Sequence, residues 1–429
     1  MTDLTIWMNG VRVGTWSRTR SGQTLQYDPG WITSSVGCVL SLSLPFTPGN
    51  APRQGDAVEN YFDNLLPDSE VLRERLQARF GTASTKPFDL LAAVGRDCIG
   101  AIQILPESET PVGFDLMESE PLTDAGVQQL IDASLSKTPP SETSDFRISL
   151  AGAQAKTALL FYRGKWRRPL RATPTTHILK LPMGFVGTSQ LDMRESVENE
   201  WLCSRLMTEF GLPTATCEIA QFGSWKVLVV ERFDRGPVTD GWIARRPQED
   251  CCQALGLPSE KKYESDGGPG IRDILRILES STAANADRRA FVKAQIVFWL
   301  LAATDGHAKN FSLFHHPEGK YRLTPFYDVL STWPIMGRRH NQISWHKAQL
   351  AMAIRSKNVH WKLCEIKRRH WDGMAALAGL GEATSLLQEV VTQTPRAIEN
   401  VNRQLPVKFP PAIADTIFEG MRRAVVDLR

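Results

Sequence analysis

The longest apolar run of the chain, Ile296–Ala303, ends directly at the polar sequence T-D-G-H-A-K-N, residues 304–310. This run is far too short to span a membrane, which takes about 20 apolar residues. It predicts a buried helix instead. A polar loop attached to the end of a buried helix is held in one place, so the chemistry of residues 304–310 constrains both the fold and the function.

Within this loop, Asp305 and Asn310 have the D-x-x-x-x-N spacing of the protein-kinase catalytic loop, where the Asp accepts the substrate hydroxyl proton and the Asn binds a metal. A predicted hairpin over 311–324 follows and leads to Asp328, where kinases place a second metal-binding acid. Mg²⁺ prefers oxygen ligands and keeps several waters, so one Asn and one Asp suit it. Such a pair is common in ordinary loops, but the buried helix and the hairpin favour the catalytic interpretation.

A kinase also needs a phosphate-binding loop and a lysine upstream. The small residues within 149–154 could let backbone N–H groups approach phosphate oxygens, although an ordinary turn is the alternative. Lys180 lies in an apolar, strand-like segment and is the candidate for the α- and β-phosphates. Glu200 is its expected partner, because at 100° per residue it shares a helical face with Met193 and Val197.

The sequence V-L-V-V-E-R-F-D, residues 227–234, ends the strand-rich region and begins a helical one. In a kinase this linker contacts adenine, so Glu231 and Phe233 are expected to flank the base. An ordinary strand end with charged residues is the alternative. Further on, the glycine-rich segment 262–270 is interpreted as a helix-capping linker, with a substrate-facing loop as the second possibility.

A length of 429 residues suits two or three domains. We predict an N-terminal β-rich subdomain over 1–120, a kinase-like N-lobe over 121–235 and a helical C-lobe over 236–429. The fold class is α+β, a two-lobed protein-kinase-like fold, and the space between such lobes is the expected ligand site. Seven cysteines without C-x-x-C spacing and the lack of a signal peptide favour reduced thiols in the cytoplasm.

The spacing of apolar residues also predicts individual elements. Helices are expected over 55–80, 123–134, 192–210, 270–278 and 287–303, and strands over 157–162, 176–181 and 225–230.

The stretch 331–370 is basic, with nine Lys and Arg against one acid, Glu365. Runs of this kind are usually solvated helix faces, and contact with DNA phosphates is the second interpretation. The candidate DNA-facing residues are Lys367, Arg368 and Arg369.

Several motifs, taken together, resemble the HipA family of bacterial toxin kinases over essentially the whole chain. They are S-L-A-G-A-Q-A-K-T-A-L-L, T-P-T-T-H-I-L-K-L-P, V-E-R-F-D-R, L-P-S-E-K-K-Y-E-S-D-G-G-P-G-I, A-T-D-G-H-A-K-N-F-S and Y-R-L-T-P-F-Y-D. The resemblance implies a serine/threonine-protein kinase that uses ATP and Mg²⁺. The chain has neither H-R-D nor D-F-G, which is typical of this family.

The resemblance also implies roles for individual residues. Asp305 would be the catalytic base, Asn310 and Asp328 the Mg²⁺ ligands, and Ser149 a site of autophosphorylation. That modification is inactivating in the family, because a phosphoserine adds a charge of about −1.5 to −2 and expels the loop from the ATP site. The ATP-binding residues would be Ala151, Gly152, Ala153, Gln154, Lys180, Glu231, Phe233 and His307.

By the same resemblance, the chain is the toxin of a type II toxin–antitoxin module. It would phosphorylate a protein such as glutamyl-tRNA synthetase, arrest growth, and bind operator DNA mainly through the antitoxin HipB, a helix-turn-helix dimer. Two alternatives stay open. The D-G-H sequence of the loop also resembles small-molecule and lipid kinases, and a non-enzymatic corepressor of an antitoxin is the third reading.

Overall fold

The computed structural model describes residues 2–20, 22–136, 149–152, 154–239, 241–379 and 383–428. The chain forms two compact units, each assembled from segments that are far apart in sequence. The first unit comprises Met1–Leu181, Ala220–Glu260 and Ser312–Tyr321, and the second comprises Pro182–Ile219, Lys261–Phe311 and Arg322–Arg429.

The first unit begins with a five-stranded antiparallel sheet in the order β4-β3-β2-β1-β5. Asn9 and Gly10 both have positive φ angles, 47° and 79°, as a two-residue hairpin turn between β1 and β2 requires. The strands are β1 (Thr2–Met8), β2 (Val11–Thr19), β3 (Gly22–Tyr27), β4 (Arg53–Gln54) and β5 (Ile102–Pro106).

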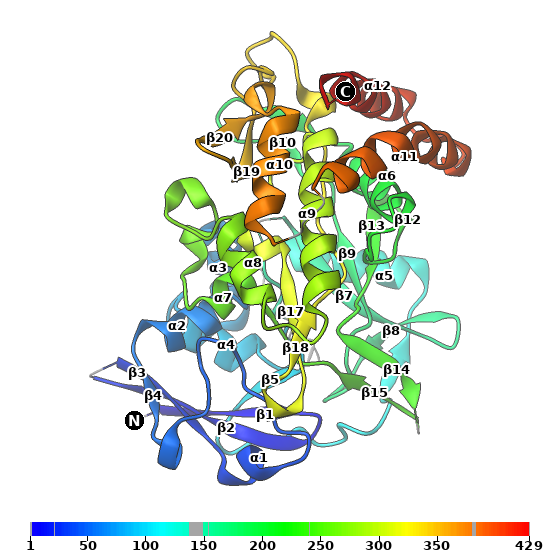
Figure 1. Ribbon diagram of the computed structural model, residues 1–429. Coiled ribbons are helices and arrows are strands. Elements are labelled where there is room, and N and C mark those ends of the chain that lie inside the picture. The colour runs from blue at the N-terminus through cyan, green and yellow to red at the C-terminus, as the bar shows by residue number, and fades with distance from the viewer. Residues whose placement is uncertain are drawn as a thin grey trace. The chain divides into compact units, whose positions relative to one another are not determined.

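Helices α2 and α4 cover one face of this sheet (Figure 1). The indole of Trp16 stacks on Phe62 with ring centroids 3.7 Å apart, and Phe88 packs on the same indole. The single helix predicted over 55–80 is wrong. Two helices form instead, because Pro67 has no N–H to continue the helical ladder. The helices are α1 (Pro29–Thr33), α2 (Asp56–Asp63), α3 (Glu70–Phe80) and α4 (Pro87–Val94).

A second sheet has the strand order β12-β13-β9-β7-β8-β6, and β12 begins in the second unit. Helix α5 (Asp124–Leu135) packs Val127 and Ile131 on Leu159 and Leu179 of this sheet. The strands predicted over 157–162, 176–181 and 225–230 are confirmed. The strands are β6 (Ser119–Pro121), β7 (Lys156–Tyr162), β8 (Lys165–Pro169), β9 (His177–Lys180), β12 (Cys217–Phe222) and β13 (Trp225–Glu231).

Smaller elements complete the first unit. A two-stranded hairpin pairs β14 with β15, and a three-stranded sheet has the order β16-β17-β18, the last strand running into the second unit. These elements are β14 (Arg235–Thr239), β15 (Trp242–Arg245), β16 (Gln248–Asp250), α7 (Cys251–Ala254), β17 (Ser312–His315) and β18 (Tyr321–Leu323).

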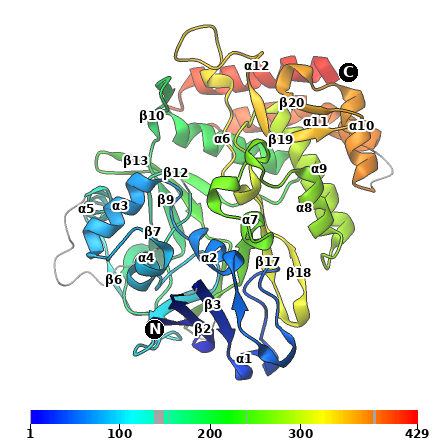
Figure 2. The ribbon, with the colours of Figure 1, turned by 90° about the vertical axis from the view of Figure 1, so that its left-hand side faces the viewer.

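The second unit is mainly helical, and its centre is α9, whose residues from Phe291 to Leu300 are all buried. Helix α9 packs against α8 and α11 (Figure 1), and α11 packs against α12 (Figure 2). The predicted helices over 270–278 and 287–303 are confirmed. The helices are α6 (Ser196–Glu209), α8 (Ile271–Leu278), α9 (Ala284–Leu300), α10 (Arg368–Leu377), α11 (Ala383–Gln404) and α12 (Pro411–Leu428).

Two hairpins, β10–β11 and β19–β20, lie beside these helices in the second unit. The helix expected over 192–210 starts only at Ser196, because the preceding residues form β11. None of the helices in the described ranges combines the length and apolarity that crossing a bilayer needs. The strands are β10 (Gly184–Val186), β11 (Leu191–Met193), β19 (Gln349–Arg355) and β20 (Val359–Lys362).

Candidate active site

The polar loop that follows α9 is a tight turn of the second unit. The N–H of His307 donates to the carbonyl of Asp305 at 2.8 Å, and the N–H of Asn310 donates to the carbonyl of His307 at 2.9 Å. Asp305 is exposed, whereas His307 and Asn310 are buried. A Cβ at Gly306 would lie 2.5 Å from the ring of Phe298, so only glycine fits between this loop and α9. The loop is therefore held rigidly, with one carboxylate facing solvent.

Asn310 and Asp328 lie side by side. The amide Nδ2 of Asn310 donates to Oδ2 of Asp328 at 3.2 Å, and its Oδ1 accepts from the N–H of His307, also at 3.2 Å. Asp328 has a φ of 61°, a left-handed conformation that is uncommon outside glycine and is often found at functional sites. The two residues predicted to bind a metal are thus adjacent.

The chemistry of this pair fits Mg²⁺. Both side chains offer hard oxygen donors, and Mg²⁺ is usually bound by one or two such groups together with waters and substrate phosphates. No group of three or more His, Cys, Asp and Glu side chains that could hold a metal alone exists among the described residues. A cation that completes its coordination with water and phosphate oxygens is therefore the one that these residues suit.

Tyr263 contacts this loop, a role that was not assigned to it from the sequence. Its hydroxyl donates to Oδ1 of Asp305, and its ring lies edge-on to His307 with centroids 5.0 Å apart. The neighbouring carbonyl of Lys262 accepts from the N–H of Ala308 at 3.1 Å. The glycine-rich segment 262–270 therefore supports the loop from outside.

The same segment is fixed at its other end. The carboxylate of Glu264 accepts from the N–H of Ala353 at 2.7 Å and forms an ion pair with Arg355, both in β19. Gly270 is the N-cap residue of α8, as the helix-capping interpretation expects, and its N–H donates to Asp273 at 3.0 Å. Tyr263 is thus held in place by residues on both sides of it.

Lys180 lies in β9 of the first unit, and its side chain is buried. In the sheet it is paired with Lys156 of β7 and with Leu228 of β13. Glu200 is buried in α6 of the second unit. The predicted ion pair between Lys180 and Glu200 stays a prediction.

The phosphate-binding loop candidate is anchored to the segment between α2 and α3. The side chain of Ser149 is fully buried, and its Oγ donates to the carbonyl of Leu65 at 2.7 Å. The N–H of Asp68 donates to the carbonyl of Gly152 at 3.2 Å. In this conformation the hydroxyl of Ser149 is closed to solvent and to any phosphate donor.

Glycine is required within this loop. Gly152 has a φ of 105°, and a Cβ there would lie 2.6 Å from Nζ of Lys156, which donates to the carbonyl of Ala151 at 2.6 Å. Gln154 donates its side-chain amide to the carbonyl of Leu181, next to Lys180. Ala153, the remaining loop candidate, lies outside the described residues.

Glu231 and Phe233, the expected adenine neighbours, follow each other at the end of β13. Glu231 is exposed, and Phe233 packs edge-on against Phe314 with centroids 5.8 Å apart. Neither the exposure of Glu231 nor the ring contact of Phe233 identifies a ligand, so the role of both residues stays a prediction. The charged residues between and after them are buried in a network of ion pairs.

Arg232, Asp234 and Arg235 belong to a buried charge network that the sequence did not reveal. Arg232 makes a two-pronged contact with Asp234, and Arg235 donates to Asp97 at 2.8 Å. Arg245 also contacts Asp97, at 3.3 Å. All five side chains are buried, so three positive and two negative charges share one interior site.

The pKa values of this network reflect burial and charge together. Burial acts to raise the pKa of Asp97, but the guanidinium groups of Arg235, Arg232 and Arg245 outweigh it and hold that pKa well below its usual range. Burial lowers the pKa of Arg235 to about 10. The carboxylate is therefore ionised at any ordinary pH, and the arginines depend on it.

The DNA-facing candidates lie at the start of α10. Lys367 is the N-cap residue and Arg369 is exposed. The ring of His370 stacks on His360 at 3.6 Å, and its pKa is lowered by burial and by the charges of His360, Arg369 and Lys367. Contact between these residues and DNA stays a prediction.

Two family models match the chain. The HipA N-terminal domain matches residues 4–105, and the HipA-like C-terminal domain matches residues 148–400. Y4mE of Sinorhizobium fredii is 32% identical over 412 residues, which cover 93% of this chain and 92% of that protein. The serine/threonine-protein kinase toxin HipA of Shewanella oneidensis is 29% identical over 408 residues, 91% of this chain and 86% of the relative.

A solved structure has the same fold. It is that of the Shewanella oneidensis HipA, HipB and operator DNA complex, and its matching chain has a TM-score of 0.78 at 23% sequence identity. The match covers 99% of this chain and 97% of the other. The α+β, kinase-like fold class expected from the sequence is confirmed.

Proposed function

Because the chain belongs to the HipA family of serine/threonine-protein kinases, we propose that it transfers the γ-phosphoryl group of ATP to a serine hydroxyl of a protein. The observation that carries this proposal is the grouping of Asp305, Asn310 and Asp328 in the second unit. It combines an exposed carboxylate on a rigid loop with two adjacent oxygen donors.

Each of these residues has a separate task. Asp305 accepts the proton of the substrate hydroxyl, and the hydroxyl oxygen bonds to the γ-phosphorus of ATP. The bond between the γ-phosphorus and the β–γ bridging oxygen breaks at the same time, which releases ADP. Asn310 and Asp328 would hold Mg²⁺. When bound, the ion neutralises charge on the phosphates. Tyr263, which donates to Asp305, keeps the carboxylate oriented until the substrate hydroxyl takes that place.

The first unit supplies most of the nucleotide-binding groups in this proposal, and the second unit supplies Glu200. Lys180 contacts the α- and β-phosphates with Glu200 as its partner, and the loop 149–154 surrounds the phosphates with backbone N–H groups. Adenine contacts Glu231 and Phe233. The proposal draws support from Gly152, whose positive φ is a backbone conformation that phosphate-binding loops often use.

Autophosphorylation at Ser149 is part of the proposal, with one condition set by burial. Because its Oγ is inaccessible and bonded to Leu65, the loop must leave residues 65–68 before the hydroxyl reaches a phosphate donor. The phosphorylated loop then carries about two negative charges and no longer fits a site for ATP phosphates.

We further propose that the chain is a cytoplasmic toxin paired with an antitoxin. A Shewanella oneidensis HipA occurs in a complex with HipB and its operator DNA. By that analogy, a helix-turn-helix dimer of the HipB type recruits this chain to operator DNA, and Lys367, Arg368 and Arg369 add phosphate contacts. An aminoacyl-tRNA synthetase, glutamyl-tRNA synthetase first, is the proposed substrate whose phosphorylation arrests growth.

The test compares the wild type with Asp305→Asn and with Asp415→Asn, which changes an exposed carboxylate of α12. Removing a general base lowers phosphoryl transfer by about 10²- to 10⁴-fold. We expect growth arrest and a new phosphopeptide on a synthetase after induction of the wild type and of Asp415→Asn only. Equal phosphorylation by Asp305→Asn would refute the assignment of the base.

Two further measurements on these variants separate the two alternatives. Radiolabel from ATP that enters metabolites and no protein would favour a small-molecule or lipid phosphotransferase. Growth arrest and operator repression that are both unchanged in Asp305→Asn would favour a non-enzymatic corepressor.

A further inference from the structure

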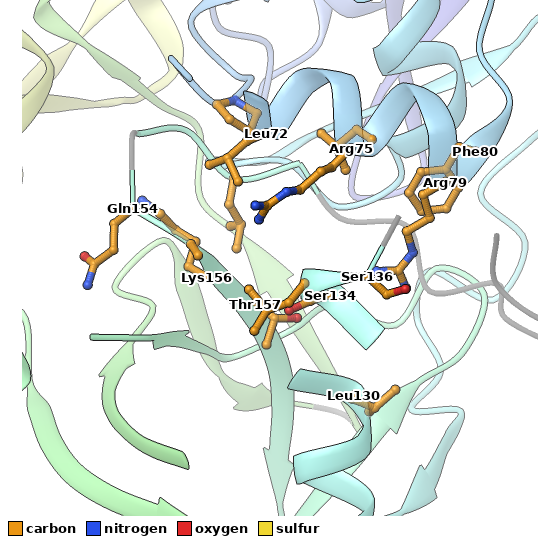
Figure 3. A pocket seen from close by; sticks show the side chains of 15 residues that line it. Leu72, Arg75, Arg79, Phe80, Leu130, Ser134, Ser136, Gln154, Lys156 and Thr157 are labelled. Carbon is orange, nitrogen blue, oxygen red and sulfur yellow. The ribbon is translucent and has the colours of Figure 1, made fainter. Parts of the chain in front are cut away.

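A pocket opens in the first unit where α3, the end of α5 and the start of β7 meet (Figure 3). Its volume is about 100 Å³. An apolar protein cavity of about 150 Å³ takes up benzene, so this smaller but open pocket can receive a small apolar group. None of the kinase residues named above other than those of the loop 149–154 lines it.

The deep side of the pocket is apolar. Leu72, Leu76 and Phe80 extend from α3, spaced by four residues and therefore on one face of that helix. Leu130 and Leu135 come from α5. This wall can bury an aliphatic or aromatic group.

Two arginines of α3 border the apolar wall. Arg75 and Arg79 are also four residues apart, and Figure 3 shows both side chains extending from the helix toward the pocket, Arg79 in the direction of Ser136. Like charges at this spacing destabilise a helix unless another group compensates them. An anion between the two guanidinium groups would offset this repulsion.

The hydrogen bonds of the two arginines are incomplete. Within the described part of the chain Arg75 makes no hydrogen bond or ion pair, and Arg79 donates only one, to the carbonyl of Ala133 at 2.8 Å. The Nε of Arg79 is buried without a partner there, and burial lowers the pKa of this side chain. Among the described residues that line the pocket, none is acidic.

Another arginine of the same helix has its hydrogen-bond donors paired within the chain. Arg73 forms an ion pair with Asp63 at 2.6 Å and donates to the carbonyl of Pro67 at 2.7 Å. The contrast indicates that the described residues leave donors of Arg75 and Arg79 available for a further partner.

We propose that this pocket binds a phosphate monoester carried on a small apolar group, with Arg75 and Arg79 holding the phosphate. The two guanidinium charges match the charge of about −1.5 to −2 on such an ester. Each planar guanidinium can donate two parallel hydrogen bonds to phosphate oxygens. The leucines and Phe80 receive the apolar group.

The pocket also joins two segments of the phosphate-loop anchor. Pro67 lies on one side and Leu150 on the other, and these segments are held together by the bond from Asp68 N–H to the Gly152 carbonyl. A ligand that contacts both segments strengthens this attachment, because it binds the attached form of the loop better than the detached one.

Phenyl phosphate is the probe that tests the site. Calorimetric titration of the full chain compares the wild type with Arg75→Gln and with Arg20→Gln, an exposed arginine in a hairpin turn of the same unit. Losing a charge-assisted hydrogen bond weakens binding by about 10- to 100-fold. We expect that loss for Arg75→Gln and no change for Arg20→Gln, with binding that weakens as salt rises.

Analogues and competition define the ligand class and the place. Inorganic phosphate, which lacks the ring, and benzyl alcohol, which lacks the charge, should both bind more weakly than phenyl phosphate. Excess Mg·ATP should leave phenyl phosphate bound. These measurements do not depend on kinase activity, so they can fail or succeed independently of the proposed function.

Hydrogen exchange supplies a second readout, in which phenyl phosphate should slow exchange at the amides of Asp68 and Ser149 in the wild type and not in Arg75→Gln. Because Arg75 makes no hydrogen bond or ion pair with the described residues, and Arg20 is exposed, both variants should melt close to the wild-type temperature. The proposal is overturned by no binding to the wild type, by equal binding to Arg75→Gln, or by complete displacement with Mg·ATP.

Discussion

Asp97→Asn is the substitution that should damage the first unit most for its size. The two side chains have nearly the same volume, so no cavity forms, and the change is in charge and in hydrogen-bond direction. Oδ2 of Asp97 accepts from both the N–H and the Oγ of Thr175, at 3.1 and 2.7 Å, and both carboxylate oxygens contact arginines. In asparagine one of these oxygens becomes an NH₂ group that faces donors.

The magnitude follows from the charges left behind. With Asp97 neutral, Arg232, Arg235 and Arg245 stay buried with Asp234 as the one carboxylate of the network. Breaking a buried ion pair by removing one partner costs about 3–5 kcal/mol. Since Asp97 contacts three guanidinium groups, we expect a loss at the upper end, about 5 kcal/mol, a large part of the 5–15 kcal/mol that stabilises a typical domain.

Urea unfolding followed by tryptophan fluorescence measures this loss, with Asp115→Asn as the control because Asp115 is exposed in the same unit. The control should change the free energy of unfolding by less than about 0.5 kcal/mol. Because the folded pKa of Asp97 lies below its unfolded value of about 3.9, its stabilisation is complete above that pH. The deficit of Asp97→Asn should therefore be equal at pH 6 and pH 8.

A second substitution checks that charge is the cause. Arg245 has one buried nitrogen, Nη1, without a hydrogen-bond partner among the described residues. Adding Arg245→Met to Asp97→Asn restores the original net charge of the network, so the double variant should recover at least about 1 kcal/mol. A single-variant loss below about 2 kcal/mol, or a double variant less stable than the single one, would refute this account of the network.

Three further outcomes are expected. Burial lowers the pKa of His177 from 6.5 to about 4, so below pH 6.5 the unfolded chain takes up a proton that the folded chain does not. Between pH 7 and pH 5 the wild type should therefore lose about 2 kcal/mol more stability than His177→Gln, as measured by urea titration. Gly152→Ala forces a side chain into a left-handed backbone against Lys156, at about 1–3 kcal/mol, and should weaken ATP binding about tenfold or more by calorimetry; unchanged affinity would remove the loop from the nucleotide site. Gly306→Ala places a methyl group against the Phe298 ring and should reduce phosphoryl transfer more than it reduces the melting temperature.

Local patterns in the sequence were sufficient for much of the fold. The apolar period of 270–278 and the run before Thr304 predicted α8 and α9, because buried faces repeat with the helical turn, although α9 ends at Leu300 and not at Ala303. The adjacency of Asn310 and Asp328 is also local, since one short hairpin connects them. Their chemical roles stay predictions.

Other features depend on contacts that no local pattern signals. Asp97 and Arg232 are 135 residues apart, and neither neighbourhood distinguishes a buried charge from a solvated one. The error over 55–80 has a local cause, because the apolar spacing continued across Pro67 and was given more weight than the missing N–H. The contact of Tyr263 was not predicted because the glycines around it favoured a linker over a substrate-facing loop.

Because Ser149 is buried, its hydroxyl can be modified only after the loop has detached. Its oxygen lies 2.7 Å from the Leu65 carbonyl, a distance with no space for a phosphoryl group. A loop that is phosphorylated while detached could not return to this buried position. Phosphorylation would therefore keep the loop detached until a phosphatase removed the phosphoryl group. The molecule would then have two long-lived states, loop attached and loop detached. The rate of passing to the phosphorylated, detached state would be limited by how often the loop detaches.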